Sequence, residues 1–496
     1  MGKFYLLFCI IASTALHAQK VANPKPFASL ITEDDLKRHL YIVASKEFEG
    51  RETATAGQRI AAAYIENHFK SIGLSPGNGN DYQLYYPVFQ DSLISAEFSV
   101  NDQPFNLNED FSVNVGADYS ATLLGSEVVF VGHGASDSSR DDYKDVNVAG
   151  KIVLVVNDDA APQQRGAGRR FNPYRVQEAA QKHGAIAILV LMKNFSGRTV
   201  SNKGNMYLAE YKKITFPNTF FISEKVAKVI LGADFANIEN LQPKTFQSNM
   251  KLELNKQVNH LQSSDVLGYL EGSDLKDQLV VISAHYDHLG KRDSVIYYGA
   301  DDDGSGTVSI LEIAQAFSKA KAAGKGPRRS ILFLANSGEE KGLWGSAYYT
   351  DHPTYPLDKT TVDLNIDMIG RIDPNRKIGD STNYVYVVGD DKLSSNLKPI
   401  SESANKKYTK LELDYKFNDP NDPERIYYRS DHFNFARKGV PIIFYFDGIH
   451  HDYHRPTDTP DKINYDIMAK RARLVFYTAW DMANRNDMLK RDIPLK

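Results

Sequence analysis

The sequence predicts an α/β fold in which a sheet is covered by helices on both faces. From residue 266 onward, short apolar runs typical of buried strands alternate with longer segments of helical periodicity. The expected strands occupy residues 279–284, 330–335, 362–367, 384–388 and 440–446. The expected helices occupy residues 306–322, 343–350, 392–404, 431–437 and 463–483. Polar residues cluster where these strands end, and ligand sites of open α/β sheets lie at such strand ends.

The rest of the chain predicts a helical N-terminal segment and an inserted module. Residues 33–72 have helical periodicity, interrupted by a polar turn at 49–53. Residues 148–191 contain a turn, an apolar strand, a helix and a second apolar strand, which together make a small α/β unit. The expected organisation is a main domain formed by residues 27–110 and 257–496, and an insert at 111–256.

Composition excludes several classes of protein and of site. The 496 residues are 42% hydrophobic and 24% charged, which is typical of a globular chain. Lys and Arg number 59 against 62 Asp and Glu, and a formal charge of −3 argues against a nucleic-acid partner. Cys9 is the single cysteine, so a metal site must be built from histidines and carboxylates.

Residues 1–18 predict a secretory signal peptide. Lys3 provides the positive charge, residues 4–15 are mostly apolar, and Ala18 ends the segment with a small residue. Cleavage would leave Gln19 at the N-terminus and place the protein outside the cell or in the periplasm. The alternative is an uncleaved membrane anchor, but the apolar run of about 12 residues is too short to cross a bilayer.

Histidines and acids gather in the second half of the chain. Seven of the 13 histidines lie between residues 285 and 454. His285 ends the first strand of this half, and Asp287 is two residues further on, on the same side of an extended chain. The Asp287 carboxylate is therefore expected to accept the outer ring N–H of His285. His288 faces the opposite side and is expected to play no part.

Three further acidic sites occur in this half of the chain. The acids at 301–303 lie among glycines at the start of a helix, but the ligand spacing of a calcium loop is missing, and a carboxylate that bridges two metals fits better. Of Glu339 and Glu340, one can ligate a metal while the other acts as a general base. A solvated acidic turn is the alternative there. Asp367 lies in an apolar strand, where a buried carboxylate requires a cation.

A histidine-rich loop follows the last strand. It contains His450, His451 and His454, and spacing alone does not select a ligand among them.

Six motif blocks resemble a known family, the MH-clan di-zinc exopeptidases that include secreted leucyl-type aminopeptidases and glutamate carboxypeptidases. The blocks are AHYDHLG, GADDDGSG, NSGEEKGLWGS, LNIDMIG, SDHFNFARKGVP and HHDYHRPTDT. AGKIVLV and AAQKHGAIAILVL are similar to a protease-associated insert. The resemblance implies a three-layer α/β/α fold with a mixed central sheet and an inserted, smaller α/β protease-associated domain.

The same resemblance implies a role for each site residue. His285 and Asp367 would be the terminal ligands of one zinc ion, Glu340 and His454 those of a second, and Asp302 the bridge. Glu339 would be the general base, Asp287 would orient His285, and Tyr453 would stabilise the oxyanion. The peptide bond between Asp302 and Asp303 would be cis.

Within this family, an aminopeptidase acting on peptides is the expected activity. A carboxypeptidase would need a cationic group for the substrate carboxylate, and Arg429 and Arg455 keep that alternative open. A cyclase would replace part of the ligand set. A non-catalytic protein resembling the transferrin receptors would have lost ligands, whereas this chain has all of them.

Overall fold

The computed structural model describes residues 22–157, 172–195, 201–208 and 215–495. The predicted signal peptide and Cys9 lie outside these residues. The chain divides into two compact units, one formed by Met1–Tyr86 with Ser263–Lys496 and the other by Pro87–Gln262. The second unit therefore extends beyond the expected insert at both ends. The reason is that two long strands, β2 (Gln83–Val100) and β12 (Lys244–Leu270), continue through the boundaries without a change in composition.

The first unit is built on a mixed sheet with a parallel centre. Its strands follow the order β1–β12–β16–β13–β17–β20–β18–β19. The four central strands β16, β13, β17 and β20 are parallel, whereas β12, β18 and β19 run in the opposite direction. Besides β12, the strands are β1 (Ser75–Pro76), β13 (Leu275–His285), β16 (Arg329–Asn336), β17 (Thr360–Ile366), β18 (Tyr384–Val388), β19 (Glu412–Asp414) and β20 (Ile442–Phe446).

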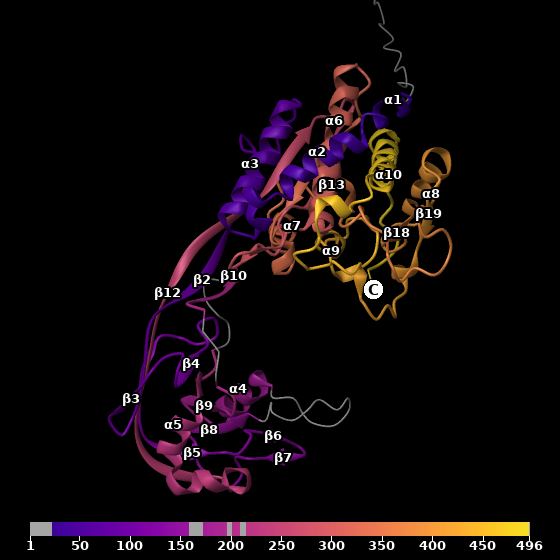
Figure 1. The fold of residues 1–496 in the computed structure, drawn as a ribbon. Coiled ribbons are helices and arrows are strands. Elements are labelled where there is room, and N and C mark those ends of the chain that lie inside the picture. The colour runs from indigo at the N-terminus through magenta and orange to yellow at the C-terminus, as the bar shows by residue number, and fades with distance from the viewer. Residues whose placement is uncertain (1–21, 158–171, 196–200, 209–214, 496) are drawn as a thin grey trace, which may run out of the picture. The chain divides into compact units, whose positions relative to one another are not determined.

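Helices cover both faces of this sheet (Figure 1). Successive residues of β13 point to opposite faces, so Val280 and Ile282 join one hydrophobic core while Leu279 and Val281 join the other. The first core is closed by α2 (Glu33–Val43), α3 (Ala56–Ser71), α6 (Gly306–Ala322), α8 (Leu397–Tyr408) and α10 (Tyr465–Asn484). The second is closed by α7 (Trp344–Asp351) and α9 (His432–Arg437). The predicted three-layer α/β/α arrangement with a mixed sheet is confirmed.

The second unit is a smaller α/β structure with two cores of its own. Its main sheet has the order β12–β5–β8–β9–β11–β4. Helix α5 closes one face and α4 the other. The elements are β4 (Phe111–Val113), β5 (Ala121–Phe130), β8 (Ile152–Asn157), α4 (Pro173–Lys182), β9 (Ala187–Met192), β11 (Asn218–Ile222) and α5 (Glu224–Leu231). Its identity as a protease-associated domain stays a prediction.

Short elements complete the two units. Strand β2 pairs with β3 (Gln103–Phe105) and β10 (Lys203–Tyr207), and two small hairpins join β6 (Ser136–Asp137) to β7 (Arg140–Asp141) and β14 (Lys291–Arg292) to β15 (Val295–Ile296). The short helix α1 (Lys25–Ala28) lies near the start of the described residues. Among the residues described, every helix is too short or too polar to span a membrane.

Arg51 ties the N-terminal segment to the loops that follow β13. Its side chain is fully buried. Its guanidinium donates hydrogen bonds to the backbone oxygens of Val43, Tyr286, Tyr298 and Gly299, at 2.7–2.9 Å. Four carbonyl groups from three separate segments are thereby satisfied by one side chain. The positions of the loops at the carboxyl edge of β13 therefore depend on Arg51.

Replacing Arg51 with Met should destabilise the first unit strongly. Met fills part of the volume but donates no hydrogen bond, and each buried carbonyl left unpaired costs about 1–3 kcal/mol. We expect a loss of at least about 3 kcal/mol, measured as a lower midpoint in differential scanning calorimetry. The matched control is Arg38→Met, because the Arg38 side chain is 58% exposed, and it should change stability by less than about 0.5 kcal/mol. Equal midpoints for the two variants would contradict the assignment.

Candidate metal centre

The strand order brings the predicted site residues to one edge of the sheet. His285 is the last residue of β13 and lies in register with Asn336, the last residue of β16. Glu339 and Glu340 follow β16, and Asp367 follows β17, which is also parallel to β13. Because parallel strands end at the same edge, residues far apart in the sequence converge there.

The first group of donor atoms surrounds the His285 ring. Its Nε2 atom lies 3.3 Å from Asp302 Oδ1, 3.6 Å from Asp367 Oδ1 and 4.0 Å from Glu339 Oε2. The ring is almost completely buried. These residues come from β13, the loop before α6, the end of β17 and the turn after β16.

The second group of donor atoms surrounds the ring of His454. Its Nε2 atom lies 3.1 Å from Asp302 Oδ2 and 3.1 Å from Glu340 Oε2. Asp302 therefore presents one oxygen to each group. Donors about 2.1 Å from a tetrahedral zinc ion are about 3.4 Å apart, and the distances in both groups are close to this spacing.

Buried atoms without partners indicate a fit to cations. His285 Nε2, Asp302 Oδ2 and Glu340 Oε1 are buried and have no hydrogen-bond partner. The carboxylates of Asp302, Glu339, Glu340 and Asp367 converge on two imidazoles. Burial of so much negative charge is costly unless cations compensate it. The donor set of histidine nitrogens and carboxylate oxygens suits zinc.

The charges of the site shift the pKa values of its members. Burial disfavours the charged form of His285, but the carboxylates of Asp367 and Glu339 outweigh it and hold the pKa of His285 well above its usual value. Burial raises the pKa of Asp302, but the nearby imidazoles of His285 and His454 lower it more, so its pKa lies well below the usual range. Burial holds the pKa of Glu339 well above that of an ordinary glutamate. Glu339 thus differs electrostatically from the bridging acid.

The acids beside Asp302 hold its loop in place. Asp303 Oδ1 accepts the backbone N–H of Met368 at 3.0 Å, and Asp301 Oδ1 accepts that of Gly370 at 2.7 Å. Asp458 Oδ2 accepts the backbone N–H groups of Asp301 and Asp302 at 2.9 and 3.2 Å. The three adjacent acids therefore have different environments, and the middle one faces both donor groups. The peptide bond between Asp302 and Asp303 is cis, as the resemblance implies.

Asp287 contacts His285 differently from the prediction. His285 Nδ1 lies 3.1 Å from the backbone oxygen of Asp287 and 3.7 Å from its Oδ1 atom. The carboxylate instead accepts the backbone N–H of Glu339 at 3.1 Å and the hydroxyl of Thr53 at 2.7 Å. The prediction of a carboxylate hydrogen bond to the ring is therefore wrong, because β13 ends at His285 and the chain turns there. Asp287 thus contacts both the ring of His285 and the backbone of Glu339.

The tertiary structure separates the histidines of the last loop. His454 joins the second donor group, whereas His450 Nε2 lies 3.2 Å from Asp301 Oδ2 and His451 is exposed. The Tyr453 ring stacks on His454 with 3.9 Å between ring centroids. Arg429 donates a hydrogen bond to the Tyr453 hydroxyl at 3.0 Å.

His288 is the residue that the sequence prediction missed. It is fully buried, and its Nδ1 atom lies 2.7 Å from Glu340 Oε1 and 3.9 Å from Asp302 Oδ2. The prediction assumed that the strand continues to His288, but β13 ends three residues earlier and the alternation of sides ends with it. The sequence feature that could have indicated this residue is a second histidine, three residues after the end of the strand.

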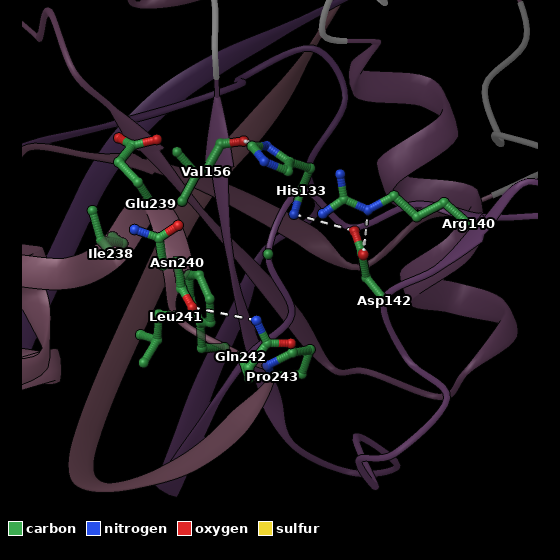
Figure 2. A pocket seen from close by; sticks show the side chains of 12 residues that line it. His133, Arg140, Asp142, Val156, Ile238, Glu239, Asn240, Leu241, Gln242 and Pro243 are labelled. Carbon is green, nitrogen blue, oxygen red and sulfur yellow. Dashed lines mark hydrogen bonds and ion pairs between the residues drawn. The ribbon is translucent and has the colours of Figure 1, made fainter.

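A cavity in the second unit lacks such a cluster. It has a volume of about 280 Å³ and is lined by residues including His133, Arg140, Asp142 and Asn240. Figure 2 shows that Arg140 and Asp142 point toward one another, and Arg140 Nε donates to Asp142 Oδ1 at 2.6 Å. Asp142 also accepts the backbone N–H groups of His133 and Ala135. Arg140 and Asp142 compensate one another, and Glu239, which also lines the cavity, pairs with Lys193 at 2.7 Å, in contrast to the carboxylates around Asp302.

Residues 265–479 match the sequence profile of peptidase family M28. These residues form a peptidase M28 domain. Both donor groups, from His285 to His454, lie within it. The match confirms the family that the six motif blocks predict, because M28 belongs to the MH clan of di-zinc exopeptidases.

Curated relatives of the M28 domain carry two kinds of name. A probable leucine aminopeptidase of Arthroderma otae is 31% identical over 217 residues, which cover 42% of this chain and 56% of the relative. A vacuolar membrane protease of Saccharomyces cerevisiae is 29% identical over 165 residues, which cover 33% of this chain and 16% of the relative. The chain thus spans about half the length of the leucine aminopeptidases that it matches, and less of the vacuolar protease.

Solved structures share the fold over nearly the whole chain. An aminopeptidase from Aneurinibacillus sp. strain AM-1 is 19% identical, with a TM-score of 0.56, and the match covers 96% of this chain and 100% of that one. A zinc aminopeptidase from Bacillus subtilis is 19% identical, with a TM-score of 0.52, and the match covers 91% and 95% of the two chains. The mixed α/β architecture of this chain is therefore that of known structures.

Proposed function

We propose that this M28 protein is a zinc-dependent exopeptidase that removes N-terminal residues from peptides. The observation that carries the proposal is the Asp302 carboxylate, which presents one oxygen to His285 and the other to His454. A carboxylate shared in this way suits two cations a short distance apart. Two zinc ions would be held, one by His285, Asp367 and Asp302, and the other by Glu340, His454 and Asp302.

When bound, two such ions polarise the scissile carbonyl and lower the pKa of water. The protein supplies the proton transfer. Glu339 is the general base in this proposal, because burial raises its pKa and its Oε2 atom lies 4.0 Å from His285 Nε2. A carboxylate with a raised pKa accepts a proton from the attacking water and later releases it to the leaving amine. Asp287 keeps Glu339 in place through the backbone hydrogen bond at 3.1 Å.

Tyr453 is the proposed donor to the oxyanion. Its ring stacks on His454, beside the donor groups. Because Arg429 donates to the Tyr453 oxygen, that oxygen acts as an acceptor toward Arg429 and its own O–H is left to donate elsewhere. A donor aimed at developing negative charge stabilises the transition state.

Carboxypeptidase activity is the second candidate, and the position of Arg429 favours it. This exposed guanidinium lies at the Tyr453 hydroxyl, where it could bind a substrate carboxylate. The aminopeptidase names belong to the relatives and to the solved structures. The polarity of cleavage therefore needs a direct experiment.

Replacing each adjacent glutamate with glutamine should separate their roles. Wild-type protein should contain close to two zinc ions. Glu339→Gln should retain them while kcat for leucine amide falls by roughly 10²–10⁴-fold, the usual contribution of a general base. Glu340→Gln should lose both rate and about one zinc ion, because it removes a ligand. Elemental analysis beside the kinetic assay measures both effects. Metal loss in the first variant with retention in the second would reverse the assignment.

Three forms of one peptide should establish the polarity of cleavage. An aminopeptidase needs a free N-terminus, so the free and the C-amidated peptide should be hydrolysed and the N-acetylated peptide should persist. Mass spectrometry of the products identifies the residue removed. Hydrolysis of the acetylated peptide with persistence of the amidated one would instead establish a carboxypeptidase.

We further propose that the protein is exported, on the basis of residues 1–18. The mature chain recovered from the periplasm or the medium should begin at Gln19, as measured by intact mass and N-terminal sequencing. Recovery of the chain in the cytoplasm with residues 1–18 attached would contradict export.

A further inference from the structure

A second histidine lies against the site of Glu340 and His454. His288 is fully buried, and its Nδ1 atom is 2.7 Å from Glu340 Oε1 and 3.9 Å from Asp302 Oδ2. Its ring lies 5.9 Å from that of His454, measured between centroids. His288, Asp302 and Glu340 each offer a ligand atom, and these atoms lie within 4.8 Å of one another. The roles assigned above to the M28 domain leave this imidazole without a function.

The contact between His288 and Glu340 is not a hydrogen bond. Despite the separation of 2.7 Å, neither His288 Nδ1 nor Glu340 Oε1 has a hydrogen-bond partner. A ring N–H must point at its acceptor, and this pair does not meet that requirement. Two ligands of one metal ion also approach without a hydrogen bond, because both donor atoms point at the ion, although 2.7 Å is closer than the spacing of about 3.4 Å around tetrahedral zinc. Asp302 Oδ2, also without a partner, completes the set.

The backbone leaves the His288 ring little freedom. A Cβ atom on Gly299 would lie 2.5 Å from the Cγ and Cδ2 atoms of the ring, so the ring packs directly on the glycine backbone. Gly299 has a φ of +54° and its carbonyl accepts a hydrogen bond from Arg51 at 2.9 Å. The ring is therefore held by a close approach that a side chain at residue 299 would prevent.

We propose that His288 binds the second metal ion through Nδ1, as a further ligand beside Glu340, His454 and the bridging Asp302. The inference rests on the proposed two-metal function. It makes the two positions unequal, because the second ion has four protein donors whereas the ion at His285 and Asp367 has three. Each protein donor adds to the affinity for zinc. The second ion would thus be the more tightly held of the two, and the first the more readily exchanged.

A cysteine at position 288 tests for direct coordination. We would prepare His288→Cys in a Cys9→Ser background, so that the introduced thiol is the single one in the chain. Sγ is one bond from Cβ and Nδ1 is two, so with its longer metal bond the sulfur reaches nearly the same ion position. On loading with Co²⁺, a thiolate ligand adds an intense charge-transfer absorption in the near ultraviolet, which an unbound thiol lacks. We expect this absorption in His288→Cys.

The control for that experiment is His432→Cys in the same background. His432 is also fully buried, but its Nε2 atom lies 2.8 Å from the backbone oxygen of Tyr427, and burial lowers its pKa to about 3. This variant should bind Co²⁺ without the thiolate absorption. If His288→Cys binds two Co²⁺ ions and also lacks the absorption, the inference about His288 is wrong. If wild-type protein binds fewer than two ions, the two-metal function itself is wrong.

Asparagine at position 288 separates a ligand from a residue that merely positions Glu340. An Asn amide can hold Glu340 in place by donating a hydrogen bond to it but is a poor zinc ligand. Because loss of a partner outside the ligand set lowers metal affinity 10–100-fold, loss of a ligand should weaken the second ion by roughly 10²-fold or more. Competition with a chelator measures the two zinc affinities without an activity assay. Two ions bound with wild-type affinity in His288→Asn would overturn the proposal.

Discussion

The Asp302 carboxylate presents one oxygen to each of two donor groups. Many contacts in the first unit hold the loop that carries Asp302 in this position. A carboxylate at the start of a buried helix would normally accept nearby backbone N–H groups. Here Asp303 accepts the N–H of Gly306 at the start of α6, and Asp301, Asp303 and Asp458 accept further backbone N–H groups, all at 2.7–3.2 Å. Asp302 Oδ2 therefore stays without a partner. The neighbouring acids of the motif thus hold the loop, while the middle one faces both donor groups.

The charge of the site is compensated from a distance by a buried cation. Burial lowers the pKa of Arg51 to about 10, and the carboxylates of Asp287, Asp302 and Asp303 act against that shift. The guanidinium contacts only backbone oxygens, so it neutralises no ligand directly. This arrangement gives a positive potential without taking a donor atom from the site. It also joins the N-terminal helices to the loops that carry His285 and Asp302.

Strained backbone conformations lie next to donor residues. His454 has a φ of +56°, and Met368, which follows Asp367, has a φ of +59°. Residues of this kind in the left-handed region cost about 1–3 kcal/mol each and persist only where the surroundings hold them. The Asp303 carboxylate holds Met368 through its N–H, and the stack with Tyr453 restrains the ring of His454. The same contacts that shape the site thus support its strained backbone.

The sequence by itself determined the elements and most of the donor residues. Helix α6 and strand β18 have the predicted bounds, because strong periodicity fixes buried elements locally. Acids and histidines at strand ends pointed to His285, to Asp367, to the acids at 301–303 and to the pair at 339–340, and the resemblance selected Asp302 and Glu340 among them. The domain boundaries were displaced, since β2 and β12 cross them without a compositional change. Spacing left three histidines of the last loop open until the resemblance selected one.

Only the tertiary structure decided which atoms meet. Asp287 reaches the His285 ring through its backbone oxygen, and His288 turns toward Glu340 instead of away from it. The physical reason is the same in both cases. The face of the sheet to which a side chain points is predictable while the chain is a regular strand. Strand β13 ends at His285. Beyond that point, direction is set by contacts with Thr53, Gly299 and Glu340, which come from distant parts of the sequence.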